Sequence, residues 1–314
     1  MANQSLHYLI IGSGGVGGSL GAFMTETGLD VTLIARGSHL AAMKGKGLAM
    51  ETTRKGNYVV HPIKAMTMEE YEASGNTPDV IFVCVKGYSL DETMPFLKAV
   101  SAPHTVVIPL LNIYGTGAKL QERLPHITVT DGCVYIAAEI REPGVIWQNG
   151  DIFRVVYGLR EGDAPCPVLE QVRDDLEQSG ISAVLSPNIR RDALRKFAYV
   201  SPMAACGVYF GITAEAAQKE GEVRQTFVSL MREIEALAQA MGITFDVDIV
   251  DTNLKILDAL SPSASTSMQR DIDHGHASEI DGLIYEVVRL GERYGVDLPA
   301  YRKIAHWCSQ RGLY

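Results

Sequence analysis

The sequence predicts an α/β domain with a doubly wound parallel sheet, followed by an all-helical domain. Two observations support this prediction. In the first half of the chain, short apolar runs typical of strands buried on both faces alternate with helical patterns, and a glycine-rich turn joins the first run to the first helix. After residue 186, these runs give way to long patterns with a period of about 3.6 residues. We therefore expect one domain over residues 1–186 and a second over 187–314.

The first strand and helix are expected over residues 6–11 and 16–27, and the turn between them has the pattern of a phosphate-binding loop. In such a loop, the first glycine makes the tight turn, the second lets the backbone approach a pyrophosphate, and the third lets the helix pack on the strand. Backbone N–H groups and the positive end of the helix dipole then face the phosphates. A Rossmann-like dinucleotide site is therefore predicted at Gly12, Ser13, Gly14, Gly15, Val16 and Gly17.

The second strand, expected over residues 30–35, ends at Arg36. A dinucleotide-binding domain that prefers NAD usually has an acidic residue here, which binds the ribose 2′-hydroxyl. An arginine instead suits the 2′-phosphate of NADP through paired, charge-assisted hydrogen bonds. Arg36 therefore favours NADP(H) as the cofactor, and a surface arginine without a ligand is the alternative.

The later strands of the first half place two polar residues where ligands usually bind. Apolar runs at residues 80–85 and 105–111 are expected to be buried strands, and Lys86 and Asn112 follow them directly. In an open parallel sheet, ligands bind at the carboxyl ends of the strands. Both residues are therefore candidate site residues, with ordinary loop polarity as the alternative. Helices are expected over residues 38–44, 68–73, 89–100 and 114–124, and further strands over 127–138 and 145–157.

The helical half contains a lysine within an apolar pattern. On its first helix, Lys196 is expected to share one face with Ile189, Ala193, Val200 and Ala204. A buried lysine is costly unless it is neutral, is paired or reaches a polar cleft. Two interpretations remain open: Lys196 extends its ammonium to water, or it is a general acid with a lowered pKa. Helices are expected over residues 189–206, 214–241, 246–260 and 276–294.

A polar cluster lies at the start of the last of these helices. Ser278 is expected to cap the helix, with Glu279 and Asp281 in its first turn, and the alternative is that Glu279 faces a ligand. His274 and His276 lie nearby but lack a third ligand at a fixed spacing. No metal site is therefore expected.

Composition argues against several classes of protein. The net charge of −9 disfavours a nucleic-acid-binding protein, which would carry a clustered basic surface. No apolar run is long enough to span a membrane, and five scattered cysteines favour free thiols in a reducing compartment. We therefore expect a cytoplasmic protein that binds neither nucleic acid nor membrane. The apolar stripes of the helical half suit either its own core or a homodimer interface.

Several motifs occur in an order and spacing that match one family: the glycine turn, Arg36-Gly37-Ser38-His39-Leu40, Val85-Lys86, Asn112, the Lys196 helix, Ser267-Met268-x-x-Asp271 and Ser278-Glu279-Ile280-Asp281. Over nearly its whole length, the chain resembles the ketopantoate reductases, also called 2-dehydropantoate 2-reductases. The resemblance implies NADPH-dependent reduction of 2-dehydropantoate to pantoate, as in the biosynthesis of pantothenate and coenzyme A. The substrate would be a small 2-oxo acid bound between the two domains.

The resemblance also implies roles for individual residues. Lys196 would protonate the substrate oxygen, Glu279 would be its charge partner, and Ser267 would contact the substrate carboxylate. Asn112 and Lys86 would lie near the nicotinamide, and Asn112 would also be close to the substrate.

The sequence departs from this family at three positions. Ile113, Val200 and Ala204 stand where the family usually has glycine, asparagine and asparagine. Losing two hydrogen-bonding groups weakens the fit to a hydroxylated substrate. One alternative is therefore a related NADPH-dependent reductase of a less polar 2-oxo acid or ketone. Another is a non-catalytic dinucleotide sensor, against which the polar residues retained in the helical half argue.

Overall fold

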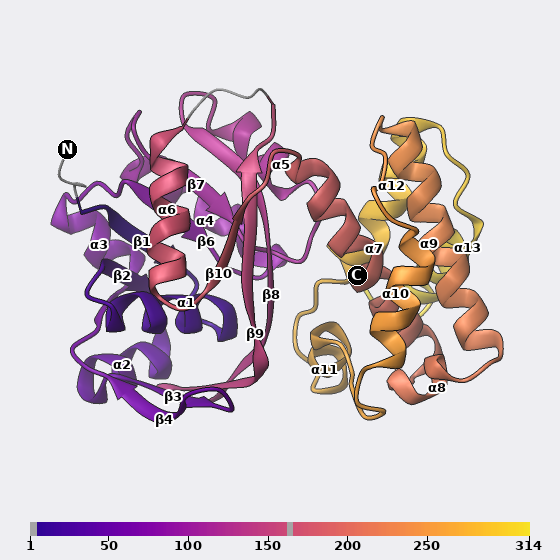
Figure 1. Ribbon diagram of the computed structural model, residues 1–314, viewed down its shortest axis with the longest axis horizontal. Coiled ribbons are helices and arrows are strands. Elements are labelled where there is room, and N and C mark those ends of the chain that lie inside the picture. The colour runs from indigo at the N-terminus through magenta and orange to yellow at the C-terminus, as the bar shows by residue number, and fades with distance from the viewer. Residues whose placement is uncertain (1–4, 162–165) are drawn as a thin grey trace. The chain divides into compact units, whose positions relative to one another are not determined.

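A computed structural model describes residues 5–161 and 166–314 (Figure 1). The first of its two units is α/β and the second consists of helices, so the predicted fold class is confirmed. The expected domain boundary stays a prediction. The first unit comprises Met1–Leu111 and Gly115–Ile189, and the second comprises Asn112–Tyr114 and Arg190–Tyr314.

The sheet of the first unit has the strand order β4-β3-β9-β8-β7-β6-β1-β2-β5, and β10 pairs with β9. The part from β8 to β5 is parallel, whereas β8 pairs antiparallel with β9 and β3 pairs antiparallel with β4. The strands are β1 His7–Ile11, β2 Asp30–Ile34, β3 Leu48–Thr52, β4 Gly56–Val60, β5 Lys64–Met66, β6 Val80–Val83, β7 Val106–Pro109, β8 Thr128–Glu142, β9 Val145–Leu159 and β10 Ser182–Leu185.

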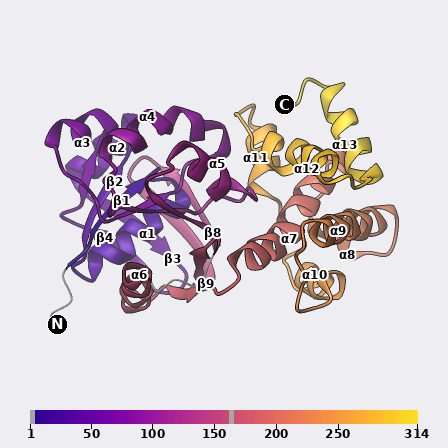
Figure 2. The same ribbon diagram turned by 90° about the horizontal axis from the view of Figure 1, so that it is seen from above.

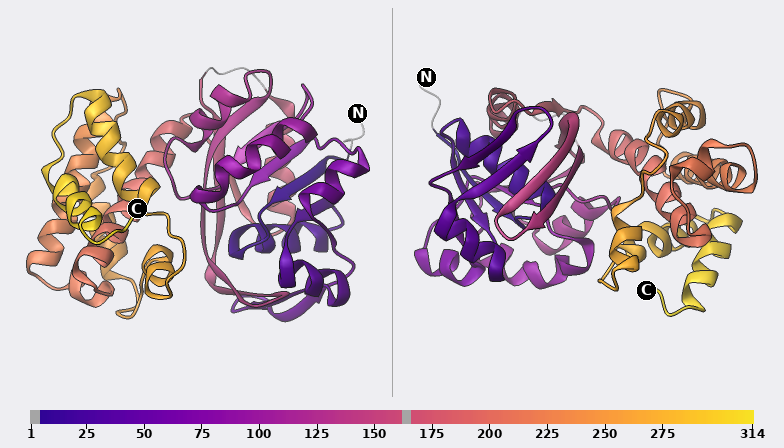
Figure 3. Two further views of the ribbon diagram at one scale, coloured as in Figure 1. Left: turned by 180° about the vertical axis from the view of Figure 1, so that it is seen from behind. Right: turned by 90° about the horizontal axis from the view of Figure 1, so that it is seen from below.

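Helices cover both faces of the parallel part of the sheet. Figure 2 shows α1 and α6 on one face and α3, α4 and α5 on the other. Figure 3 shows the long strands β8 and β9 running to the small hairpin β3–β4, where β3 pairs with β9. The helices are α1 Gly15–Glu26, α2 Gly37–Lys46, α3 Met68–Ser74, η1 Gly87–Ser89, α4 Leu90–Val100, α5 Thr116–Arg123 and α6 Pro167–Gln178.

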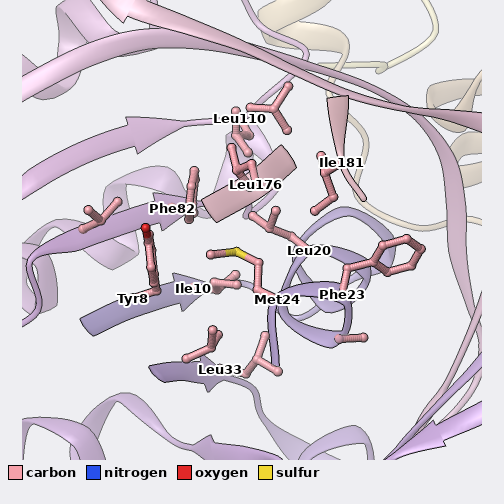
Figure 4. Packing of buried hydrophobic residues seen from close by; sticks show 14 of the residues in the cluster. Tyr8, Ile10, Leu20, Phe23, Met24, Leu33, Phe82, Leu110, Leu176 and Ile181 are labelled. Atoms are coloured by element: carbon pink, nitrogen blue, oxygen red, sulfur yellow. The ribbon is translucent and has the colours of Figure 1, made fainter. Parts of the chain in front are cut away.

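The core explains why the strands read as unbroken apolar runs. Successive residues of a strand point to opposite faces, and both faces of this sheet are covered. Tyr8 and Ile10 belong to the cluster that packs against α1 and α6, and Figure 4 shows them beside Met24 of α1. Leu9 and Ile11 belong to the cluster on the opposite face, with residues of α3, α4 and α5. The predicted burial of these strands is confirmed.

The second unit is built around helix α9, whose apolar face is buried at Phe227, Leu230 and Ile234. The helix expected over residues 276–294 begins instead at Asp281 as a π-helix and continues as α12. No helix in the described part of the chain is both long and apolar enough to cross a bilayer. The helices are α7 Ile189–Phe210, α8 Ala214–Gln218, α9 Glu222–Ala240, α10 Ile249–Asp258, α11 Ser267–Asp273, η2 Asp281–Tyr285, α12 Glu286–Tyr294 and α13 Pro299–Ser309.

Candidate functional site

The glycine-rich turn makes close contacts that only glycine permits. Gly12 has a φ of +96°, and a Cβ there would lie 2.9 Å from the backbone carbon of Cys84. A Cβ at Gly17 would lie 2.0 Å from the Gly12 carbonyl oxygen, so α1 packs directly against the turn. A Cβ at Gly14, in contrast, would meet no other described atom within 4 Å. The turn is thus tight where it meets the sheet and open at its middle, as a phosphate-binding loop requires.

A cavity of about 560 Å³ lies beside the open side of this turn. Its lining brings together Gly12–Gly14, Arg36 after β2 and Lys86 after β6. Glu69 and Glu92 also line it, so its lining carries charges of both signs. Five of the residues predicted to bind the cofactor, from three separate segments, therefore surround one space.

The rest of the predicted turn faces protein rather than this cavity. A Cβ at Gly15 would lie 2.2 Å from the Ala138 carbonyl oxygen, and one at Gly18 would lie 2.0 Å from Ile146 Cδ1. Strands β8 and β9 therefore pass directly over the start of α1, where Val16 packs against the core. Gly15 inside the motif and Gly18 directly after it are the sequence signal for this crossing, which sequence reasoning missed.

His39 also lines the cavity, and the sequence analysis did not select it. Its Nδ1 accepts a hydrogen bond of 3.0 Å from the backbone N–H of Gly144, which joins α2 to the β8–β9 turn. Burial lowers the pKa of His39, and the nearby Ser13 carbonyl partly offsets this effect. A neutral ring is needed here, because a protonated Nδ1 could not accept the Gly144 bond. The position of His39 three residues after Arg36, in the first turn of α2, could have indicated a place at the cavity.

Lys196 and Asn112 meet within the second unit. The Lys196 ammonium donates a hydrogen bond of 2.6 Å to Asn112 Oδ1. Asn112 begins the short segment Asn112–Tyr114, and at the other end of this segment Tyr114 packs on Phe197 with ring centroids 6.1 Å apart. Two candidate residues that are 84 positions apart in the sequence are therefore in direct contact.

The apolar stripe expected around Lys196 is only partly buried, which corrects the sequence interpretation. Ala193, Lys196 and Val200 are half-buried. Ser201 is fully buried instead, because its hydroxyl donates to the Leu283 carbonyl at 2.6 Å and is therefore satisfied in the core. The hydrophobic pattern cannot show such a bond and so misplaces the buried face. Around Lys196 the buried residues are Leu194, Phe197, Ala198 and Ser201, and of the expected stripe only Ile189 and Ala204 are buried.

Glu279 and Ser267 belong to the same unit, each near the start of a helical segment. Glu279 is 4% exposed and comes two residues before the π-helix η2. Ser267 is the first residue of α11. Single-turn π-helices inside α-helices are frequent at functional sites, so the position of Glu279 is consistent with a functional role. The roles of Lys196, Glu279, Ser267 and Asn112 stay predictions.

The expected cap at Ser278 is wrong. The residue before the π-helix is Ile280, and no side chain caps this end. Asp281 lies in the first turn, as expected, and its carboxylate also accepts hydrogen bonds from Arg289 at 2.8 and 2.9 Å. Within residues 5–161 and 166–314, no group of three or more His, Cys, Asp or Glu residues is arranged to hold a metal ion.

Comparison with known proteins covers almost the whole chain. Residues 8–162 match the family described as ketopantoate reductase PanE/ApbA, and residues 188–311 match the C-terminal domain of that family. The chain is 26% identical over 305 residues to the uncharacterized oxidoreductase YkpB of Bacillus subtilis, covering 95% of this chain and 96% of that protein. It is 25% identical over 294 residues to the 2-dehydropantoate 2-reductase of Pyrococcus horikoshii, covering 92% of each chain.

Solved structures show the same fold. The crystal structure of 2-dehydropantoate 2-reductase from Methylococcus capsulatus aligns with a TM-score of 0.87 at 24% identity, covering 98% of this chain and 97% of that one. A D-mandelate dehydrogenase in a ternary complex with NADH and anilino(oxo)acetate aligns with a TM-score of 0.84 at 21% identity, covering 95% and 96% of the two chains. Because both parts of the family match in order along one polypeptide, the chain belongs to the ketopantoate reductase family.

Proposed function

We propose that this protein is an NADPH-dependent reductase of a 2-oxo acid, with Lys196 as the proton donor. The family reaction, 2-dehydropantoate to pantoate in pantothenate and coenzyme A biosynthesis, is the first candidate. One observation carries the catalytic part of the proposal: the hydrogen bond of 2.6 Å between the Lys196 ammonium and Asn112 Oδ1. A structural lysine would need no such partner, because it could extend its charge to water.

The residues around the cavity fit a dinucleotide. The open space over Gly14 admits a pyrophosphate, and the backbone N–H groups at the start of α1 would bind it. Arg36 is exposed at the cavity and presents a fork suited to a 2′-phosphate, which favours NADPH over NADH. Lys86 adds a positive charge from the adjacent strand end. When bound, a reduced nicotinamide supplies the hydride.

Lys196 would hold and release the proton. An ammonium has three N–H donors, and Asn112 Oδ1 accepts one of them, which fixes the direction of the side chain. We propose that another N–H faces the carbonyl oxygen of the substrate and transfers its proton as negative charge develops there. Asn112 follows β7 by three residues, so the chain tethers it to the carboxyl end of a strand in the dinucleotide-binding sheet. Glu279 and Ser267 are proposed as the charge partner and the carboxylate contact.

A second candidate substrate is a less polar 2-oxo acid or ketone. Val200 lies one turn after Lys196 and is half-buried, so an apolar group stands beside the proposed proton donor. Ala204, one further turn along, is completely buried and offers no hydrogen bond. A substrate with a distal hydroxyl would lose a partner there, whereas one with an alkyl or aromatic group would not.

Steady-state oxidation of NADPH with a panel of substrates tests the proposal. The panel includes 2-dehydropantoate, the same acid without its distal hydroxyl, and an aromatic 2-oxo acid. Val200 predicts a higher kcat/KM for the less polar acids, and a clear preference for 2-dehydropantoate would show that other residues replace the two asparagines. Turnover of none of these compounds, with tight NADPH binding retained, would favour a dinucleotide sensor.

A further inference from the structure

Ile113 and Gly282 fit together within the second unit. If position 282 carried a Cβ, it would lie 2.3 Å from Ile113 Cδ1, 2.6 Å from Cγ1 and 3.0 Å from Cγ2. The Ile113 side chain therefore lies against the bare backbone of the π-helix η2, in space that any other residue at 282 would fill. Gly282 does not have a positive φ, so the chain does not need glycine there for its backbone conformation. The need for glycine comes from this contact.

This contact holds the middle residue of the segment Asn112–Tyr114, whose first and last residues also make contacts. Asn112 binds the Lys196 ammonium at 2.6 Å, and Tyr114 packs on Phe197. Ile113 lies between them. A β-branched side chain has few allowed rotamers, so fixing the Ile113 side chain also fixes the backbone that carries Asn112.

We propose that Ile113 is a positioning residue, which, seated against Gly282, holds the Asn112 amide at the Lys196 ammonium. The catalytic consequence rests on the proposed function, in which Lys196 donates the proton. The π-helix η2 contributes by carrying Gly282. The residues at 113 and 282 are therefore a matched pair, and changing one requires a change in the other.

The test is a pair of variants with a second-site rescue. Gly282→Ala adds the Cβ that displaces Ile113, and we expect kcat to fall by roughly 10- to 100-fold, because a shift of about 1 Å in a catalytic group can have that effect. The KD for NADPH should change far less than kcat, since every described residue that lines the cavity belongs to the first unit. Adding Ile113→Ala removes all three crowding atoms, so the double variant should recover most of the lost kcat. Ile113→Ala alone should also lower kcat, by leaving Asn112 loosely held.

Gly291→Ala is the matched control. A Cβ there would lie 2.5 Å from Leu298 Cδ1, so helix α12 of the same unit is crowded to a similar degree. We expect this variant to lower the melting temperature and to keep a near-native kcat. Adding Ile113→Ala to it should lower kcat as it does in the wild-type protein, with no rescue. If Gly282→Ala keeps its kcat, or if Ile113→Ala does not rescue it, the positioning role is refuted.

A readout independent of turnover separates this inference from the proposed function. The rate at which an amine-reactive acetylating reagent labels Lys196, followed by peptide mass spectrometry, reports how firmly Asn112 holds the ammonium. Labelling should rise several-fold in Gly282→Ala and return toward the wild-type rate in the double variant. If this pattern appears in a protein that reduces no 2-oxo acid, the positioning role stands and the proposed function fails. If labelling is the same in all variants, the positioning role is refuted whatever the activity.

Discussion

Replacing Lys196 by alanine tests the proposed proton donor directly. The substitution removes the ammonium and leaves Asn112 Oδ1 without the donor that lies 2.6 Å away. General acid catalysis by a positioned side chain is worth about 10²- to 10⁴-fold, so kcat should fall by a factor in that range. Lys196 is half-buried and belongs to the second unit, so neither folding nor the cavity beside the glycine turn should change.

A second variant separates the proton from the positive charge, and a third is a control. Lys196→Arg keeps the charge, but a guanidinium does not give up its proton in proteins, so this variant should also lose most of its kcat. Lys255→Ala removes an exposed lysine of the same unit that binds Asp251 at 2.7 Å on α10, and its kcat should stay at the wild-type value.

The assay combines stopped-flow oxidation of NADPH with fluorescence titration of the cofactor. A single-turnover measurement at saturating substrate reports the chemical step, and the titration reports cofactor affinity. Near-wild-type single-turnover rates in Lys196→Ala would refute the acid role and assign the proton to another group or to water. A joint loss of NADPH binding and folding would instead make Lys196 a structural residue.

Three other predictions concern the first unit. Arg36→Ala should weaken NADPH binding by about 1.5–3 kcal/mol, the contribution of a hydrogen bond to a charged group, and leave NADH binding nearly unchanged. Equal effects on both cofactors would show that Arg36 does not bind the 2′-phosphate. Arg54→Ala, away from the cavity, is the control. Tyr8→Phe should lower the unfolding free energy by about 1–3 kcal/mol in urea, because buried Asp175 loses the hydroxyl that donates to it, whereas exposed Tyr294→Phe should have no effect. Burial lowers the pKa of His39 from 6.5, so the stability that its neutral ring provides is present above about pH 6.5 and is lost as the pH falls. The unfolding free energy of His39→Gln should therefore fall less steeply toward about pH 5. If it falls as steeply as in the wild-type protein, the lowered pKa of His39 is contradicted.

The sequence predicts the first unit well because its signals are local. A parallel strand covered on both faces must be apolar at every position, and β1 shows this at Leu9 and Ile10, which belong to core clusters on opposite faces. Part of the glycine turn is equally local, because Gly12 and Gly17 are needed for contacts within the same β–α unit or at the end of the neighbouring strand. Gly17 against the Gly12 carbonyl is the clearest case.

Features that depend on contacts between distant parts of the chain could not be predicted from the sequence. Ser201 lies in the core because of a bond to the Leu283 carbonyl, 82 residues later, and no hydrophobic pattern records such a bond. The same holds for Asn112 and Lys196. Each was a candidate by its own local position, after a strand and on an apolar helix, but only the folded chain shows that they meet.

Ile113 and Gly282 show what a broken local rule can mean. A glycine within a helical segment costs about 1 kcal/mol relative to alanine, and Gly282 does not have a positive φ that would require it. Ile113 likewise stands where the resembled family usually has glycine. Taken singly, each residue departs from a local pattern, but in the structure the Ile113 side chain occupies the space that a side chain at position 282 would fill. Local rules are most often broken at functional sites, and this pair lies next to the Asn112–Lys196 contact. In the proposed mechanism, the loss in helix propensity at Gly282 is offset by the firm positioning of Asn112 at the Lys196 ammonium.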